Sequence, residues 1–499
     1  MIELYENFLQ YFGELADLRE SKALLGWDER VCMPKKSVEG RSRTKATLSR
    51  FIQSKLTSEK MKDFIEKLNK ESELSKLDDE QKANVREATR EFERAYNVPE
   101  ELVEKISETA SLSRSAWVES KEKEDFEEFL PWLEKMVELR KEMAEHIGYE
   151  DEPYDALIDG YEPGMRTCQV ERTLTDLRDG LIPIVEKFED VENSSLAAVD
   201  GGEFDPGSQE ELCRGIIEDL DYDFDRGRLD TSEHPFTIGM EKDTRITNRY
   251  DPDNIQSIFS AIHETGHAIY HQNIPDEFAR KPVGKAASMG FSESQARLWE
   301  NQIGRSREFI EFTYPKIRDK FSKFEKVPLE KFHRYINRIS PTHIRVNADE
   351  ITYNLHILLR FEIEIGLFRG EILPKEVPQV WENKMDEYLG ITPSSPSEGP
   401  LQDVHWSTGA FGYFPTYSLG NMYAAQVYET MREELNDFDE KVRTGKFSQI
   451  TDFLTRNIYR HGRKYGPNEL LKNITGGKVN EKYFLNYLKN RYYPVYGLD

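Results

Sequence analysis

Helical periodicity is the feature that most constrains how this chain can fold. Apolar residues recur at three- and four-residue spacing, with charged residues between them, over residues 1–27, 40–70, 78–149 and 448–494. This spacing puts the apolar side chains on one face of an α-helix. A chain of 499 residues can bury a large core. We therefore predict a mainly α-helical globular protein.

Three segments depart from the helical pattern. Residues 234–250 carry β-branched residues on both sides of a turn-like Glu-Lys-Asp, which predicts a short β-hairpin. Residues 192–209 are rich in Ser, Gly and Asp, and residues 391–400 are rich in Pro and Ser, so both are predicted to be exposed loops. The first loop is a possible boundary between two lobes. We find no internal repeat and treat residues 1–499 as a single domain with a core from about residue 210 to 499.

The charge and cysteine content exclude several classes of function. A net charge of −25 argues against nucleic acid and against an anionic membrane, since both bind clustered positive charge. The three cysteines are far apart and show no C-x-x-C spacing, which favours a reducing compartment. No signal-peptide pattern and no run of eighteen apolar residues is present. We expect a cytoplasmic protein.

One motif carries recognisable chemistry, the sequence His263-Glu264-Thr265-Gly266-His267. Residues four apart on a helix lie one above the other on one face, so His263 and His267 can direct ring nitrogens at one metal ion about 2 Å away. Glu264 is offset from this pair, which suits a base acting on water better than a third ligand. The pattern predicts a catalytic metal site of the zinc type.

A catalytic zinc site needs a third protein ligand. His271 continues the four-residue spacing, but three collinear side chains do not form the base of a tetrahedron. The longer motif with a third His fails, because Asn273 occupies that position. A carboxylate from a following helix is the other solution, and Glu293 is the favoured candidate with Glu300 as its competitor.

The same five residues have plainer explanations. With ten histidines, chance alone produces an H-E-x-x-H pattern in roughly two of a hundred such chains. A helical scaffold with surface histidines would look the same locally. A non-catalytic binding protein that keeps a metal for stability is a further alternative, although such a site has no use for the base Glu264.

A series of short blocks follows in a fixed order along most of the chain. The blocks are Ala23 to Asp28 with Met33-Pro34, Tyr154 to Met165, His234-Pro235-Phe236, Asp243 to Thr247, the H-E-x-x-H motif, Glu293-Ser294-Gln295, Ile344 to Asp349, Gly399 to Trp406, Gly412 to Tyr417 and Arg460 to Tyr465. Each block alone is weak, but together they resemble the carboxypeptidase Taq family of metallocarboxypeptidases.

The resemblance implies a helical, two-lobed peptidase with a deep central cleft, a small β-hairpin near the active site, and N-terminal helices of residues 1–150 in the lid of the cleft. It implies release of single C-terminal residues from peptide substrates with broad specificity. It also implies a homodimer with one divalent metal ion per chain, Zn²⁺ or alternatively Co²⁺. In the family the third ligand is the residue that corresponds to Glu293. The nearest rival is a metallo-oligopeptidase that cuts short peptides internally.

Two positions depart from the family pattern. The family usually has His where this chain has Ser292, and an Asn-Ile-His sequence where this chain has Asn457-Ile458-Tyr459. Neither position is one of the proposed ligands. Hydrogen-bond partners of ligands can nevertheless change metal affinity or activity by roughly 10- to 100-fold, so rate and metal preference are the properties these departures affect.

Candidates for the remaining roles lie in the other blocks. His405 and Tyr417 resemble the His and Tyr that related helical peptidases place over the oxyanion, with Tyr413 as the alternate. His234 resembles a substrate-holding His. The substrate carboxylate calls for the planar fork of an arginine, and Arg345 is favoured over Arg245. Each of these residues could instead be structural; for the arginines the partners would be Asp349 and Asp243.

Overall fold

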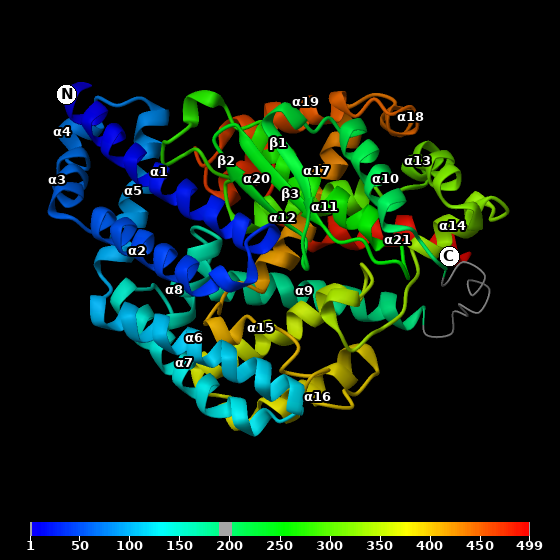
Figure 1. Cartoon of the computed structure of the whole chain (residues 1–499), viewed down its shortest axis with the longest axis horizontal. Coiled ribbons are helices and arrows are strands. Elements are labelled where there is room, and N and C mark those ends of the chain that lie inside the picture. Colours follow the sequence, from blue (N-terminus) through cyan, green and yellow to red (C-terminus); the bar gives the residue numbers. More distant parts are fainter. Residues whose placement is uncertain (1, 189–201, 499) are drawn as a thin grey trace. The chain divides into compact units, whose positions relative to one another are not determined.

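The computed structural model describes residues 2–188 and 202–498, and most of them are helical, which confirms the predicted fold class. The chain divides into two compact units, Met1–Tyr96 with Leu196–His333 and Val427–Gly476, and Asn97–Ser195 with Arg334–Gln426 and Gly477–Asp499 (Figure 1). Two of the boundaries between the units fall inside helices, one in α14 (Leu329–Ile336) and one in α17 (Pro415–Glu434). No described helix has the length and apolar character that crossing a bilayer requires.

The first unit contains a small sheet and most of the short helices. Its elements are α1 (Ile2–Val31), η1 (Lys35–Ser37), α2 (Val38–Leu56), α3 (Glu59–Leu68), α4 (Glu71–Leu74), α5 (Asp79–Tyr96), α10 (Pro206–Asp219), η3 (Phe224–Arg226), β1 (Gly227–Thr231), β2 (Phe236–Met240), β3 (Asp243–Asn248), α11 (Gln256–Gln272), η4 (Asp276–Phe278), α12 (Met289–Arg297), the π-helical segment η5 (Leu298–Ile303), α13 (Arg307–Lys320), η6 (Ser322–Phe324), α18 (Phe438–Arg443), α19 (Ser448–Asn457), η10 (Tyr459–His461) and α20 (Pro467–Thr475).

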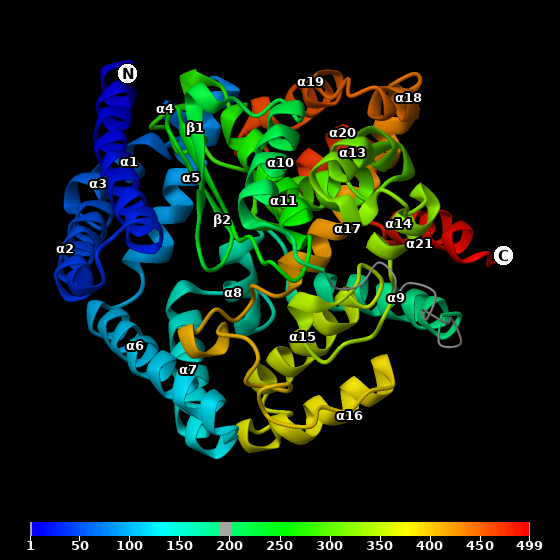
Figure 2. The ribbon, with the colours of Figure 1, turned by 45° about the vertical axis from the view of Figure 1, so that its right-hand side comes forward.

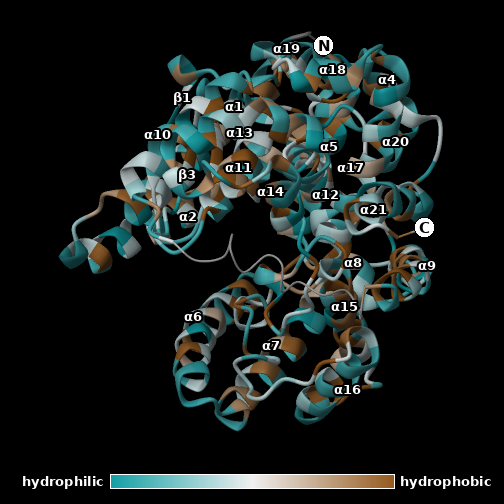
Figure 3. Ribbon diagram, turned by 90° about the vertical axis from the view of Figure 1, so that its right-hand side faces the viewer, coloured by the Kyte–Doolittle hydropathy of each residue, from teal (hydrophilic) through white to brown (hydrophobic). Residues whose placement is uncertain are grey.

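The second unit is helical in its described residues. Its elements are α6 (Glu100–Lys123), α7 (Phe126–Ile147), α8 (Pro153–Tyr161), α9 (Thr167–Glu186), η7 (Arg345–Asn347), α15 (Tyr353–Arg369), η8 (Pro374–Glu376), α16 (Val377–Leu389), η9 (Trp406–Thr408) and α21 (Glu481–Tyr496). Hydrophobic and hydrophilic residues share individual helices such as α7 and α16, as the periodicity predicts (Figure 3). Helix α15 is the exception, since nearly every residue on it is buried.

The predicted hairpin is present as strands β2 and β3, which pair antiparallel with Phe236 opposite Thr247. A third strand, β1, adds in parallel to β3, so the strand order is β1-β3-β2. Strand β1 was not predicted, because Gly227-Arg-Leu-Asp-Thr is short and polar and shows no strand alternation. Helix α11 packs against β2 and β3, and this contact positions the H-E-x-x-H motif (Figure 1).

The N-terminal helices form their own core within the first unit. Residues from α1, α3 and α5 meet in one cluster, whose aromatic members are Tyr5, Phe8, Phe12, Phe64 and Phe92. Figure 2 shows α1, α2, α3 and α5 gathered together, in agreement with their contacts. Helix α1 also touches β2, so these helices are tied to the sheet that carries part of the site.

The two loop predictions have different outcomes. Residues 391–400 contain no helix or strand, as predicted. Most of the loop predicted over 192–209 lies outside the described residues. The predicted end of this loop at residue 209 was wrong, since α10 begins at Pro206. The Asp205 side chain accepts a hydrogen bond from Ser208 N and caps this helix. An Asp-Pro-Gly sequence reads locally as a turn, yet Asp is also a preferred N-cap and Pro a preferred first helical residue.

Candidate metal centre

Three side chains of the first unit converge on one point. The Nε2 atoms of His263 and His267 lie 3.9 Å and 3.8 Å from Oε2 of Glu293. All three possible ligand atoms lie within 4.8 Å of one another. Nitrogen and oxygen ligands about 2.1 Å from a tetrahedral ion are about 3.4 Å apart, so the spacing here fits a divalent metal with little adjustment. Of the three candidates for a third ligand, Glu293 is the one in this group.

A close approach between two helices brings the ligands together. Gly266 lies between the two histidines, and a Cβ atom there would stand 2.6 Å from Cα of Ala296 on α12. Only glycine therefore allows α11 and α12 to pack this closely. Helix α12 starts where the Ser288 side chain accepts a hydrogen bond from Phe291 N, which puts Glu293 in the second turn.

The other nitrogen of each histidine has its own partner. His263 Nδ1 lies 2.8 Å from Oε2 of Glu300, and His267 Nδ1 lies 2.9 Å from Oγ of Ser292. When Nδ1 donates to these oxygens, the lone pair of Nε2 points at Glu293 and is available to a metal. The competitor Glu300 thus touches the far side of a ligand, and Ser292 occupies the same kind of position for His267.

Two arginines fix the carboxylates around the site. Arg297 Nε donates to Oε1 of Glu293 at 2.7 Å, which leaves Oε2 for a metal. Arg297 and Arg305 also pair with Glu300 at 3.5 Å and 3.3 Å. Burial alone would raise the pKa of Glu293, but Arg297 and the two histidines hold it below its ordinary value. Glu293 is therefore an anion where a cation has to bind.

Glu264 is buried beside the three ligands and contacts the sheet. Thr237 Oγ1, on β2, lies 2.6 Å from Oε2 of Glu264 and donates to it. Burial is the main reason that the pKa of Glu264 is above its ordinary value, and Thr237 and His263 partly oppose it. A carboxylate with a raised pKa accepts a proton more readily than an exposed one, as a general base must.

His271 is close to these residues but outside the group. Its ring lies against β2, where a Cβ atom at Gly239 would stand 2.4 Å from it. Burial lowers the pKa of His271 to about 4, so the ring is neutral at physiological pH. This position fits a structural role for His271.

The substrate-binding candidates of the first unit differ in exposure. His234 is exposed just before β2, and its carbonyl accepts from Ser232 Oγ at 2.7 Å. Arg245 is half-buried: its Nε and Nη2 donate to Asp243 at 2.8 Å and 2.7 Å, and its guanidinium lies 4.3 Å from the ring centroid of Trp27. Arg245 has the structural partner that was its alternative explanation.

The remaining candidates gather in the second unit. Arg345 Nη2 and Arg360 Nε donate to opposite oxygens of Asp403 at 2.8 Å and 2.7 Å, so two guanidinium groups share one carboxylate. Arg345 Nη1 also donates to the hydroxyl of Tyr353 at 3.0 Å. The partner of Arg345 is therefore Asp403 and not Asp349, which instead accepts from the backbone of Ser340.

His405 lies next to this cluster with the two tyrosines. Its Nε2 is 3.5 Å from the hydroxyl of Tyr417, and its ring centroid is 5.5 Å from that of Tyr413. Burial lowers the pKa of His405 to about 4, although Asp403 opposes the shift. A neutral His and a Tyr hydroxyl are both able to donate a hydrogen bond to a developing oxyanion.

Comparison with known proteins identifies the family. The family model described as Carboxypeptidase Taq (M32) metallopeptidase matches residues 7–492. The chain is 37% identical to thermostable carboxypeptidase 1 of Thermus thermophilus and 38% identical to carboxypeptidase 1 of Bacillus subtilis, with 99% of each chain covered. The solved structure of a Pyrococcus furiosus carboxypeptidase superimposes with a TM-score of 0.95 at 37% identity, covering 98% of this chain and 99% of that one. The chain belongs to the carboxypeptidase Taq (M32) family.

Membership of the M32 family confirms the resemblance read from the sequence blocks. The protein is a metallocarboxypeptidase, a hydrolase of peptide bonds, and its His263, His267 and Glu293 group is consistent with the H-E-x-x-H metal site of the family. Thr237 and Arg297, which contact Glu264 and Glu293, were not predicted. Nothing in the sequence distinguishes Thr237 from other threonines in strands, or Arg297 from other arginines in helices.

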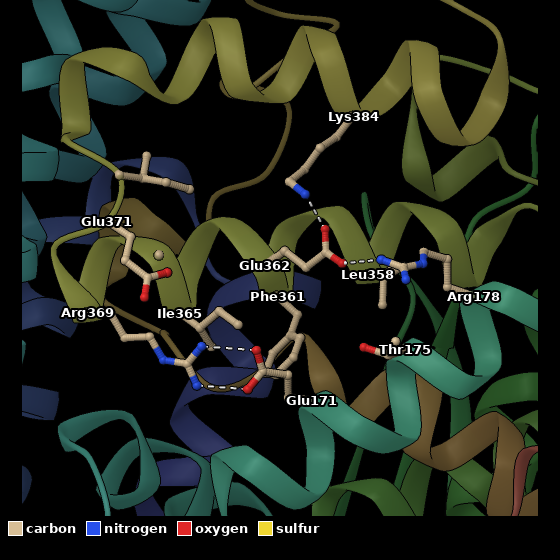
Figure 4. A pocket seen from close by; sticks show the side chains of 12 residues that line it. Glu171, Thr175, Arg178, Leu358, Phe361, Glu362, Ile365, Arg369, Glu371 and Lys384 are labelled. Carbon is tan, nitrogen blue, oxygen red and sulfur yellow. Dashed lines mark hydrogen bonds and ion pairs between the residues drawn. The ribbon is translucent and has the colours of Figure 1, made fainter.

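The M32 chain also has a cavity away from these residues, in the second unit. It has a volume of about 330 Å³ and lies between α9, α15 and α16 (Figure 4). Arg369 pairs with Glu171 at 2.8 Å, and Glu362 pairs with both Arg178 and Lys384. With Glu371, the cavity is lined by as many acidic as basic side chains, and none of the predicted site residues is among the described residues that line it.

Proposed function

We propose that the protein releases single amino acids from the C-termini of peptides, with a divalent metal held by His263, His267 and Glu293. The observation that carries the proposal is the convergence of both Nε2 atoms on Glu293 Oε2, with the buried carboxylate of Glu264 beside them. Two nitrogens and one oxygen favour Zn²⁺, with Co²⁺ as the alternative. We further propose a homodimer with broad specificity, as the family resemblance implies, and a cytoplasmic location, as the cysteine content suggests.

The proposed chemistry divides between the metal and Glu264. When bound, the metal ion supplies a water of lowered pKa, from about 15.7 toward about 7, and polarises the scissile carbonyl. Glu264 accepts the proton of the attacking water and later passes it to the leaving amine. Thr237 holds Oε2 of Glu264, which fixes the direction in which the carboxylate presents its other oxygen.

We assign the donors to the oxyanion to His405 and Tyr417, with Tyr413 as the alternate. Their support is chemical: His405 is neutral near pH 7 because burial lowers its pKa to about 4, and its Nε2 and the hydroxyl of Tyr417 lie 3.5 Å apart. His234 is assigned to hold the substrate near the scissile bond, which its exposure allows.

We assign the terminal carboxylate of the substrate to Arg345. Three of its five N–H groups are used by Asp403 and Tyr353. One N–H on each Nη remains, and together these form the fork that a carboxylate accepts. Arg360 and Arg345 share the single carboxylate of Asp403, so the cluster keeps a surplus positive charge. Arg245 is the second choice, because Asp243 and Trp27 already hold its guanidinium.

The experiment is mass spectrometry of a peptide ladder after incubation with Zn²⁺- or Co²⁺-loaded protein. Stepwise loss of one C-terminal residue at a time is expected, together with resistance of the same peptide when its C-terminus is amidated. Efficient cleavage of the amidated peptide would instead show an oligopeptidase that cuts internally. Glu264→Gln should abolish turnover while the protein still binds metal, and unchanged turnover would refute the catalytic role of Glu264.

A further inference from the structure

The carboxylate of Glu364, in the middle of α15, joins three segments of the second unit. Its side chain is fully buried, at 0% exposure. Oε1 accepts from the indole Nε1 of Trp406 at 2.8 Å, and Oε2 accepts from the backbone N of Gly412 at 2.9 Å and from the hydroxyl of Tyr154. All three donors are neutral. A buried carboxyl costs free energy unless each of its oxygens is hydrogen-bonded, so this arrangement is a built feature of the fold.

These bonds hold the segment that carries His405. Trp406 directly follows His405, and Gly412 directly precedes Tyr413. Before His405, Asp403 accepts from Arg360 Nε at 2.7 Å. Arg360 is four residues ahead of Glu364, so both side chains leave the same face of α15. One face of α15 therefore contacts residues on both sides of His405. The Arg360 guanidinium binds Asp403 before it, and the Glu364 carboxyl binds Trp406 and Gly412 after it.

The segment also packs directly on α8. Gly412 has φ +86°, and a Cβ atom there would stand 2.8 Å from the carbonyl carbon of Leu157. Tyr154, one turn earlier on α8, supplies the third bond to Glu364. The sequence block from Tyr154 to Met165, which has no role in the proposed chemistry, thus provides a surface on which the His405 segment packs.

We propose that Glu364 is a positioning residue for the peptidase reaction, whose carboxyl group fixes residues 405–413 and so sets the orientation of His405. The inference rests on the proposed catalytic role of His405. Both the indole N–H and the backbone N–H are donors that cannot rotate, so each oxygen of residue 364 has to accept. A misplacement of about 1 Å at a catalytic group can cost about 100-fold in rate, which is the size of effect that such a clamp prevents.

Only a carboxyl group meets this requirement among isosteric side chains. Burial raises the pKa of Glu364 to about 7, so both protonation states are populated near neutral pH. The neutral acid still accepts on both oxygens if its proton points to the hydroxyl of Tyr154, which can accept as well as donate. An amide cannot, because its NH₂ group would face the N–H of either Trp406 or Gly412.

Because of this donor conflict, a second substitution that removes one donor is expected to restore activity instead of lowering it further. Glu364→Gln should lower kcat by about 10- to 100-fold, with KM for an N-blocked dipeptide and metal content within about threefold of the wild type. Adding Trp406→Phe removes one of the two clashing donors, since the amide oxygen can then serve Gly412. The double variant is expected to recover at least a third of the lost kcat. Tyr154→Phe is the matched control when it is assayed above about pH 8, where Glu364 is ionised and needs no acceptor for a proton. There it removes only the rotatable donor and should change kcat by less than about threefold.

A role in packing alone predicts the opposite, because Trp406 is itself buried and its loss should add to that of Glu364. A double variant with a kcat at or below that of Glu364→Gln would overturn the proposal. If Glu364→Gln does not fold, recovery of folded protein in the double variant supports the proposal equally, and failure of both variants to fold contradicts it. His405→Ala distinguishes the proposed role of His405 from that of Glu364. An unchanged kcat in His405→Ala refutes the proposed role of His405. A lowered kcat in His405→Ala together with a wild-type kcat in Glu364→Gln refutes the role of Glu364.

Discussion

The two histidines of the proposed metal site are held by chemically different partners. His263 Nδ1 faces the carboxylate of Glu300, which is itself paired with Arg297 and Arg305, whereas His267 Nδ1 faces the neutral hydroxyl of Ser292. A carboxylate partner makes an imidazole a better electron donor than a hydroxyl does. The site is therefore asymmetric, and Ser292, where the family usually has His, is the residue that makes it so.

This asymmetry predicts a graded loss of metal affinity. Ser292→Ala removes the hydroxyl that contacts His267 Nδ1 and should raise the Kd for Zn²⁺ by about tenfold, the low end for such partners. Glu300→Gln should raise it by more. Competition with a chromophoric chelator measures both values. Ser292→Thr keeps the hydroxyl and serves as the control; a Kd for Ser292→Ala equal to that of the threonine variant would rule out the role of the hydrogen bond.

A second prediction at this scale concerns Glu364 and pH. Burial raises its pKa from the ordinary value of 4.5 to about 7 in the folded protein. The folded state therefore binds a proton that the unfolded chain has already lost between these two values. The stabilisation from this group is complete below pH 4.5 and is lost as pH rises through about 7, a change of about 3 kcal/mol.

The measurement is calorimetric Tm from pH 4.5 to 8 for the wild type and Glu364→Gln. The Tm of the wild type relative to the variant should fall across this window and become level above pH 7, because the amide does not titrate. A constant difference in Tm at every pH would show that Glu364 keeps an ordinary pKa when folded.

At the scale of elements, the packing of α11 on α12 determines whether a site exists. Gly266→Ala puts a methyl group 2.6 Å from the backbone of Ala296. Relieving such an overlap typically costs about 1 to 3 kcal/mol and would move Glu293 away from the histidines. We expect a lower Tm and a Zn²⁺ Kd raised by at least about tenfold, measured by calorimetry and by chelator competition.

Gly215→Ala on α10 is the matched control for that substitution. It lies in a helix of the same unit, and its Cβ would meet nothing within 4 Å. Alanine there should stabilise the protein by about 0.5 to 1 kcal/mol and leave the Kd unchanged. Equal behaviour of the two variants would mean that the effect at residue 266 is one of helix propensity and not of close packing.

The same elements show what the sequence could and could not predict. The helices, the β2–β3 hairpin and the placement of His263 and His267 follow from local spacing, because each depends on residues a few positions apart. The sequence favours Glu293 over Glu300, but the family resemblance is needed to settle the choice. Arg297 pairs with Glu293 four residues away, but this spacing is common in helices and does not by itself mark a metal site. Thr237 and Glu364 act through contacts between distant parts of the chain, which local sequence patterns do not predict. Strand β1 is of the same kind, because it is a strand only through its pairing with β3.

At the scale of the whole molecule, the proposed roles are divided between the two units. The possible metal ligands and Glu264 belong to the first unit, whereas His405, Tyr417 and Arg345 belong to the second. A ligand that binds only the folded state stabilises it by RT ln(1 + [L]/Kd), which is about 4 kcal/mol at a thousandfold excess over Kd. That stabilisation should act first on the elements that supply the ligands.

Removal of the metal should therefore destabilise the elements that supply the ligands more than the rest of the chain. Hydrogen exchange measured by mass spectrometry should show faster exchange in α11, α12 and η5 of the chelated protein, because these elements hold His263, His267, Glu293 and Glu300. Exchange should stay unchanged in α15, which carries Glu364, and in α8, whose Tyr154 bonds to it, because these bonds involve no metal. Re-addition of Zn²⁺ should restore protection, but not in Glu293→Ala. Equal loss of protection in α11 and α15 would show that the metal stabilises the chain as one cooperative unit, and that the Glu364 clamp does not hold its segment independently.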